Sequence, residues 1–129
     1  MKGFLFVSGI LFLLVGFGGL AQPAEYAGRF GMALGGVDGL NQMRATAGGV
    51  TLGCGLLLLL GTFYDHLARA ALGMATVVLG GLVTGRLISL MIDGVPARVV
   101  WLSAGVELLG FAQALFWFLD DLKSRKIEE

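Results

Sequence analysis

Two residues of opposite charge, Arg86 and Glu107, lie well inside stretches of the sequence that are otherwise apolar. An ionisable side chain inside a membrane-spanning helix costs roughly 2.5–3.5 kcal/mol on insertion scales, so it usually marks an internal ion pair or a functional site. A guanidinium with donors to spare can also bind an anionic group. The pair therefore indicates either a bridge that locks two helices together or a binding site for a polar head group.

Other polar residues have the spacing needed to join this pair. Ser89 and Asp93 follow Arg86 at i+3 and i+7, which places a hydroxyl and a carboxylate on the same helix face. Asn41 and Arg44 are spaced i, i+3 where the second apolar segment begins, at the same end of the spans. The predicted ligand-binding residues are Asn41, Arg44, Arg86, Ser89, Asp93 and Glu107.

Catalytic, metal-binding and nucleic-acid-binding sites have no support in the sequence. The single cysteine, Cys54, and the single histidine, His66, lie away from the polar cluster, so one chain offers neither a nucleophile with its base nor a Cys/His metal set. The formal net charge is zero, and no basic run supplies the footprint that nucleic acids require. We expect no cofactor and no metal, and we favour a binding protein over an enzyme.

The chain that must position these residues is much more apolar than a soluble protein. Of its 129 residues, 57% are hydrophobic and 14% are charged, whereas soluble domains are about one quarter charged. The apolar segments cover about residues 3–21, 45–63, 67–92 and 99–119. Each can cross about 30 Å of hydrocarbon as a helix, and none has the short alternating strands of a barrel. The sequence predicts a single all-α domain, a four-helix transmembrane bundle over residues 1–129.

The first segment also has features of a secretory signal, with Lys2 before an apolar run and the small residue Ala21 at its end. Its apolar run of about 19 residues exceeds the 7–15 residues of a signal core and approaches the length of a span. We therefore expect an uncleaved first helix.

Basic residues set the expected orientation in the membrane. Lys2, Arg69 and the basic residues after the last span fall on one side, whereas Arg29, Arg44 and Arg98 fall on the other. The positive-inside rule then places both termini in the cytoplasm. We expect a multi-pass protein of the inner membrane.

Glycine has two patterns in the sequence. The long stretch of residues 22–43, between the first two predicted spans, interleaves glycine with apolar residues. It is predicted to be an outer loop, either an interfacial segment that covers a site or a flexible connector. Gly49-x-x-x-Gly53 and Gly81-x-x-x-Gly85 predict close helix packing, with oligomerisation as the lesser option.

Three motifs give the chain a family resemblance. They are Asn41-x-x-Arg44-Ala45-x-x-Gly48-Gly49, then Gly85-Arg86-Leu87-Ile88-Ser89 leading to Asp93-Gly94-x-Pro96, and Glu107 in the last span. Together they resemble a bacterial family of small four-helix integral membrane proteins catalogued as a domain of unknown function. The resemblance covers residues 41–107 and implies a four-helix bundle without implying an activity. A broader similarity to DoxX-like proteins is an analogy of fold alone.

Three functions are compatible with these residues. In the first, an outward-facing polar pocket binds the head of a membrane lipid or another amphipathic small molecule, in a monomer or a homo-oligomer. In the second, the Arg86–Glu107 bridge only fixes the fold, and the protein is an accessory subunit that assembles with a partner membrane subunit. In the third, the protein is a small proton-coupled transporter in which Glu107 carries the proton.

Overall fold

The structure is a computed structural model that describes the backbone of residues 1–128 and the side chains of residues 1–124, and this part of the chain contains no strand. Its helices are α1 (Lys2–Ala21), α2 (Pro23–Arg29), α3 (Gly36–Met43), the π-helical segment η1 (Arg44–Val50), α4 (Thr51–Phe63), α5 (Asp65–Ile92) and α6 (Arg98–Glu128). The helices long and apolar enough to cross a membrane are Lys2–Ala21, Gly36–Phe63, Asp65–Ile92 and Arg98–Ser124. The predicted all-α bundle with four membrane-spanning helices is confirmed.

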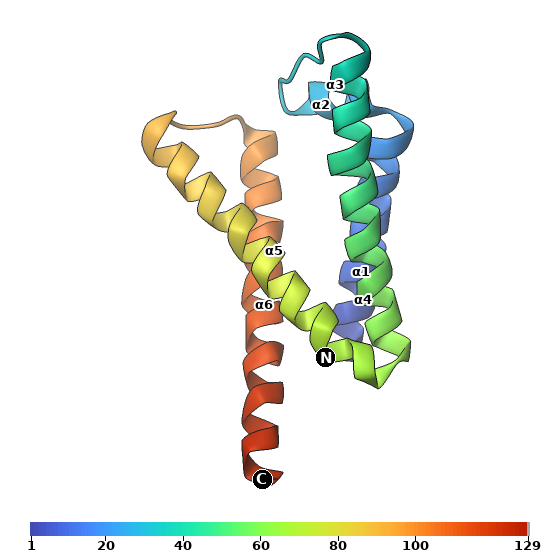
Figure 1. Cartoon of the computed structure of the whole chain (residues 1–129). Helices are drawn as coiled ribbons and strands as arrows, with labels where there is room; N and C mark the ends of the chain where they lie inside the picture. The colour runs from blue at the N-terminus through green and yellow to red at the C-terminus, as the bar shows by residue number, and fades with distance from the viewer. Residues whose placement is uncertain (129) are drawn as a thin grey trace.

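The four spans form two antiparallel pairs (Figure 1). Helix α1 lies beside the continuous α3–η1–α4 helix, while α5 leaves the foot of α4 on a diagonal path and α6 returns beside it. Short connections at Tyr64 and at residues 93–97 place α5 beside both α4 and α6. We call the end that holds α2 and residues 93–97 the loop end, and the end that holds Met1 and Tyr64 the terminal end.

Buried glycines bring α1 close to its partner helix. These glycines are Gly9, Gly16 and Gly19 of α1, Gly48 of η1 and Gly55 of α4. A Cβ added at Gly16 would lie 2.7 Å from the backbone nitrogen of Leu52, and one added at Gly19 would lie 2.7 Å from the carbonyl carbon of Ala47. Only glycine allows two helix backbones to approach in this way, which is how helices commonly associate in membranes.

The glycine pairs that the sequence singled out do not perform this packing, so that expectation was wrong within one chain. A Cβ at Gly53, Gly81 or Gly85 would meet no atom within 4 Å, and one at Gly49 would meet only Arg44 O at 3.7 Å. Gly48, the residue before Gly49 in η1, faces α1 instead. The face that contacts α1 includes Gly48, Leu52, Gly55 and Leu59, which are spaced by four and three, so Gly49 and Gly53 lie one residue away from it.

The stretch of residues 22–43 is mostly helical and not one long loop. Pro23 is at the first position of α2, where its fixed φ angle and missing N–H suit a helix start. Only residues 30–35 connect α2 to α3, and Gly36 begins the next helix with a φ of 59° that favours glycine. The second spanning helix therefore starts at Gly36, well before the predicted start at Ala45. Its first turns contain polar residues, which are typical of loops but are also acceptable at the end of a helix.

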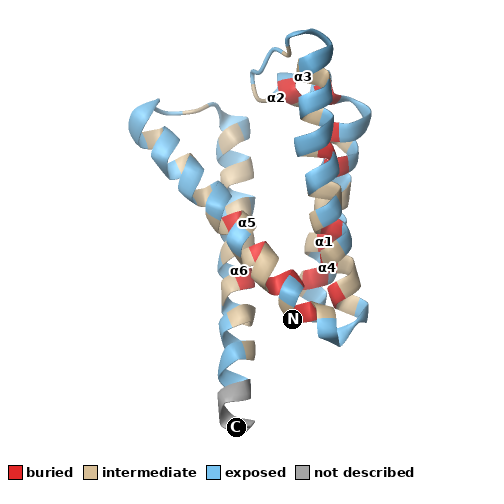
Figure 2. Cartoon of the chain, viewed as in Figure 1, coloured by how far each residue is buried: buried red, intermediate tan, exposed pale blue. Residues whose placement is uncertain are grey.

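The apolar core lies where α5 passes the feet of the other helices, toward the terminal end (Figure 2). It consists of Leu5, Leu58, Ala68, Ala71, Leu72, Ala75, Leu79 and Ala114. Small alanines on one face of α5 allow this helix to cross its neighbours closely. Toward the loop end, α5 exposes most of its apolar side chains, as expected of a helix that contacts lipid.

Candidate functional site

Arg86 of α5 and Glu107 of α6 form an ion pair held by two hydrogen bonds. Arg86 Nε donates to Glu107 Oε2, and Arg86 Nη2 donates to Glu107 Oε1 at 2.6 Å. This fork-to-fork arrangement adds geometric specificity to the charge attraction. The side chains are only 30% and 16% exposed, respectively. The structure thus pairs the two residues of opposite charge that the sequence analysis singled out as a bridge or a binding site.

The turn between α5 and α6 places two more of the predicted residues at the same end. Ser89 Oγ donates to Asp93 Oδ2 at 2.8 Å, and the backbone N–H of Asp93 donates to the carbonyl oxygen of Ser89 at 2.7 Å. Gly94 then reverses the chain with a φ of 97°, a conformation that favours glycine. Arg86, Ser89, Asp93 and Glu107 therefore all lie in the loop half of the α5–α6 hairpin.

Asn41 and Arg44 lie on a different helix, and the structure does not join them to this group. Both side chains are exposed on the α3–η1 part of the second span, which packs against α1 and α2. Arg44 Nε donates to the carbonyl oxygen of Leu20 at 3.0 Å, at the C-terminal end of α1, where a cation is favourable. Among the described residues, Glu107 has an ion pair with Arg86 and none with Arg44.

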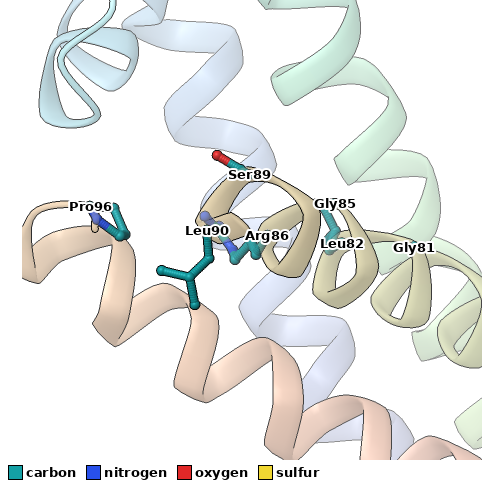
Figure 3. Close-up of a pocket in the computed structure, with 7 residues that line it drawn as sticks. All are labelled: Gly81, Leu82, Gly85, Arg86, Ser89, Leu90 and Pro96. Atoms are coloured by element: carbon teal, nitrogen blue, oxygen red, sulfur yellow. The ribbon is translucent and has the colours of Figure 1, made fainter. Parts of the chain in front are cut away.

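A hollow of about 370 Å³ lies beside Arg86 on the surface of α5 (Figure 3). It is lined by Gly81, Leu82, Gly85, Arg86, Ser89, Leu90 and Pro96. The residues spaced four apart, Gly81, Gly85 and Ser89, leave a strip of nearly bare helix backbone along one side. This is the face whose glycines are not used to pack helices within the chain.

A second hollow, of about 210 Å³, lies between α5 and α6. Its lining is mostly apolar and includes Leu87, Val100, Trp101 and Leu108. Arg86 lines this hollow as well as the first. The guanidinium is therefore the polar group that both hollows share.

One nitrogen of the Arg86 guanidinium has no acceptor in the part of the chain that the structure describes. The Glu107 carboxylate accepts hydrogen bonds from Nε and Nη2 of Arg86, and no described residue accepts a hydrogen bond from Nη1. A guanidinium carries five N–H donors, so a paired arginine can still bind a further oxygen. The site can therefore offer a charge-assisted donor without breaking its own ion pair.

Sequence reasoning missed Tyr26, which is not among the predicted ligand-binding residues. Tyr26 lies on α2, and its ring packs 5.5 Å from that of Phe30, measured between centroids. Burial raises the pKa of the Tyr26 hydroxyl, the Glu107 carboxylate raises it further, and the Arg86 guanidinium lowers it. The phenol is thus within electrostatic reach of the ion pair, which no sequence spacing could indicate because α2 was not predicted as a helix.

A second bridge between α5 and α6 was also missed. Arg69 Nε donates to Asp121 Oδ2 at 2.8 Å toward the terminal end of the hairpin. In the sequence, Arg69 contributes only to the expected orientation in the membrane. The antiparallel register of α5 and α6 could have indicated this bridge. Once Arg86 pairs with Glu107 at one end of the hairpin, the register determines which residues can pair at the other end.

The raised pKa of Tyr26 gives a titration that can be measured. In Tyr64→Phe, which leaves one tyrosine, the absorbance at 295 nm should rise with a midpoint above the usual tyrosine pKa of 10.0. Since the unfolded chain loses this proton first, the hydroxyl contributes stability below pH 10 that is lost as the pH rises through the folded pKa. A midpoint at or below 10.0 in the folded protein would contradict the burial of the Tyr26 hydroxyl and its position near Glu107.

The described part of the chain offers no alternative chemistry at this site. No three His, Cys, Asp or Glu side chains among the described residues are grouped to hold a metal ion. Cys54 lies inside the second span, on α4, and His66 lies near the start of α5, at the opposite end of that helix from Arg86. The arrangement is suited to binding and orienting a polar group next to apolar surface.

Comparison with known proteins gives the family but no activity. The family model described as a domain of unknown function, DUF4345, matches residues 1–118. No curated protein and no solved structure matches the chain. The match includes α1, for which the sequence offered no feature beyond hydrophobicity. Because it extends over all four spans and the residues of the α5–α6 site, the chain belongs to the DUF4345 family.

Proposed function

We propose that this protein, which we place in the inner membrane, binds the polar head of a lipid or another amphipathic molecule beside Arg86. The observation that carries this proposal is the Nη1 nitrogen of Arg86, which has no acceptor among the described residues and belongs to a side chain that lines both hollows. A guanidinium at such a position suits a phosphate, carboxylate or carbonyl oxygen. Ser89, one turn further along α5, adds a hydroxyl to the lining of the larger hollow.

The apolar lining supports an amphipathic ligand rather than a small polar one. The bare strip at Gly81 and Gly85 continues from Arg86 toward the middle of the span, flanked by Leu82. Residues four apart on a helix are about 6 Å apart along its axis, so the strip is long enough to contact several methylenes. A ligand with its head at Arg86 would place its tail along α5 in the lipid layer.

The proposal is tested by filling the larger hollow without touching the ion pair. A side chain at Gly85 meets no atom within 4 Å at its Cβ, so Gly85→Leu should leave the fold intact. Gly53→Leu is the matched control, because Gly53 is also exposed, helical and free of neighbours at its Cβ but lies on α4. Native mass spectrometry of gently extracted protein measures the retained ligand.

We expect wild type and Gly53→Leu to carry the same bound amphipathic molecule and Gly85→Leu to lose most of it. Loss of at least tenfold corresponds to about 1.4 kcal/mol of binding free energy. The proposal fails if wild type carries nothing, or if Gly85→Leu retains the molecule as well as the control does.

The second candidate function is an accessory role in a membrane complex, and the completeness of the ion pair favours it. Arg86 and Glu107 neutralise each other through two hydrogen bonds, as a purely structural bridge would. In that case the extracted protein would be free of ligand and would co-purify with a partner membrane subunit under the same gentle conditions.

A further inference from the structure

Gln113 is a polar residue in the middle of the α6 span that faces away from the rest of the chain. By helix rise it lies about 22 Å from Arg98 and about 17 Å from Ser124, the ends of this span. Its side chain is exposed, and no residue in the described part of the chain forms a hydrogen bond with it. At this depth the exposed face of α6 meets hydrocarbon, where water cannot replace the missing partners.

The Gln113 amide therefore requires a partner from outside this chain. A glutamine side chain has two N–H donors and one carbonyl acceptor, so one amide can pair fully with a second amide. Leaving such a group without hydrogen bonds in an apolar medium is unfavourable, and polar side chains in spans commonly bond across helix interfaces. Gln113 thus distinguishes this face of α6 from a surface that merely contacts lipid.

The residues around Gln113 have the spacing of a helix–helix seam. The exposed residues at alternating intervals of four and three are Leu102, Val106, Leu109, Gln113 and Phe116, which we call the α6 seam. This is the heptad spacing by which two helices pack side by side with a left-handed twist. Figure 2 shows how much of α6 remains uncovered by the other helices. A single polar residue in an apolar seam is a known means of fixing register.

We propose that the α6 seam binds the α6 seam of a second copy of this chain, with Gln113 paired to Gln113 of that copy. Two identical chains insert in the same orientation, so a two-fold axis along the membrane normal brings every residue to its counterpart at the same depth. The self-complementary amide fits this arrangement without any further polar residue. No residue of the α6 seam lines either hollow, so the dimer does not depend on the proposed ligand site.

Cysteine cross-linking tests the contact directly. In a Cys54→Ala background, purified Leu109→Cys is reconstituted in liposomes and oxidised, with Leu108→Cys as the matched control. Both side chains are similarly exposed, at 62% and 55%, but Leu108 points to the side of α6 away from the seam. We expect a disulfide-linked dimer for Leu109→Cys at several times the yield of the control. Equal yields at the two positions, or no dimer, overturn the proposal.

Substitution of the amide tests the chemistry of the contact. Energy transfer between labelled copies, measured as the protein is diluted in lipid, should show about tenfold weaker association for Gln113→Leu. Gln113→Asn, which keeps the amide, should retain part of the affinity. Because residue 113 is exposed and forms no hydrogen bond within the described part of the chain, Gln113→Leu should not unfold the protein. Association that Gln113→Leu leaves unchanged or strengthens would contradict the amide pairing.

Discussion

Replacing Glu107 with alanine is expected to destabilise the protein by about 3 kcal/mol, and replacing Arg86 with alanine by about half as much. Both changes leave one charge of the pair without its partner among apolar helices. The consequences differ because a lone carboxylate can be neutralised by taking up a proton, whereas a guanidinium remains charged at any accessible pH. Glu107→Ala keeps the charge of Arg86 without a partner, so it should lose more stability than Arg86→Ala.

The measurement is the loss of helical circular dichroism as SDS is added to protein in mild detergent micelles. Glu25→Ala is the control, since it breaks the Arg29–Glu25 pair of α2, whose side chains are both more than half exposed. Exposed pairs of this kind contribute little, and we expect a change within about 0.5 kcal/mol. Equal losses for Glu107→Ala and Arg86→Ala would show that the charge left behind does not decide the outcome.

Exchange of the two charges separates the bridge from the ligand site. The double variant Arg86→Glu with Glu107→Arg restores an ion pair at the same depth, so it should recover most of the stability lost in either alanine variant. It also moves the guanidinium from α5 to α6, away from the bare strip at Gly85. We expect a stable protein that has lost its bound amphipathic molecule. A double variant no more stable than Glu107→Ala would exclude a simple bridge.

The spans and the ion pair were predictable because the membrane leaves the chain few choices. Hydrocarbon requires each long apolar segment to be a helix, and short connections make neighbouring segments antiparallel. With these constraints, counting residues from the turn at residues 93–97 is sufficient to bring Arg86 and Glu107 to one depth. Ser89 and Asp93 follow from helix periodicity on the same element.

Features that depend on three-dimensional packing could not be predicted from the sequence. The face of the second span that contacts α1 includes Gly48, Leu52 and Gly55, and no residue pattern favours it over the neighbouring face that carries Gly49 and Gly53. The diagonal path of α5 separates its loop half from η1, which leaves Arg44 bonded to Leu20 instead of the ion pair.

Substitution of a buried glycine in α1 is expected to have the other large effect on stability. Gly16→Ala places its Cβ 2.7 Å from the backbone nitrogen of Leu52 and 3.1 Å from the carbonyl oxygen of Gly48. Both are backbone atoms of the partner helix, so no side-chain rotation can relieve the clash, and the two helices must move apart. Overpacking of this kind costs about 1–3 kcal/mol. Gly19→Ala meets the backbone of Ala47 and should behave in the same way.

Gly53→Ala on the partner helix is the matched control, because its Cβ would meet no atom within 4 Å. Alanine favours a helix over glycine by roughly 0.5–1 kcal/mol, so the control should be unchanged or slightly stabilised in the same SDS titration. The same Gly→Ala change should lower stability at residue 16 and leave it unchanged or raise it at residue 53. This difference separates the effect of helix packing from that of helix propensity. If Gly16→Ala and Gly53→Ala shifted the midpoint together, the close approach of α1 and α4 would not be what holds the first helix pair.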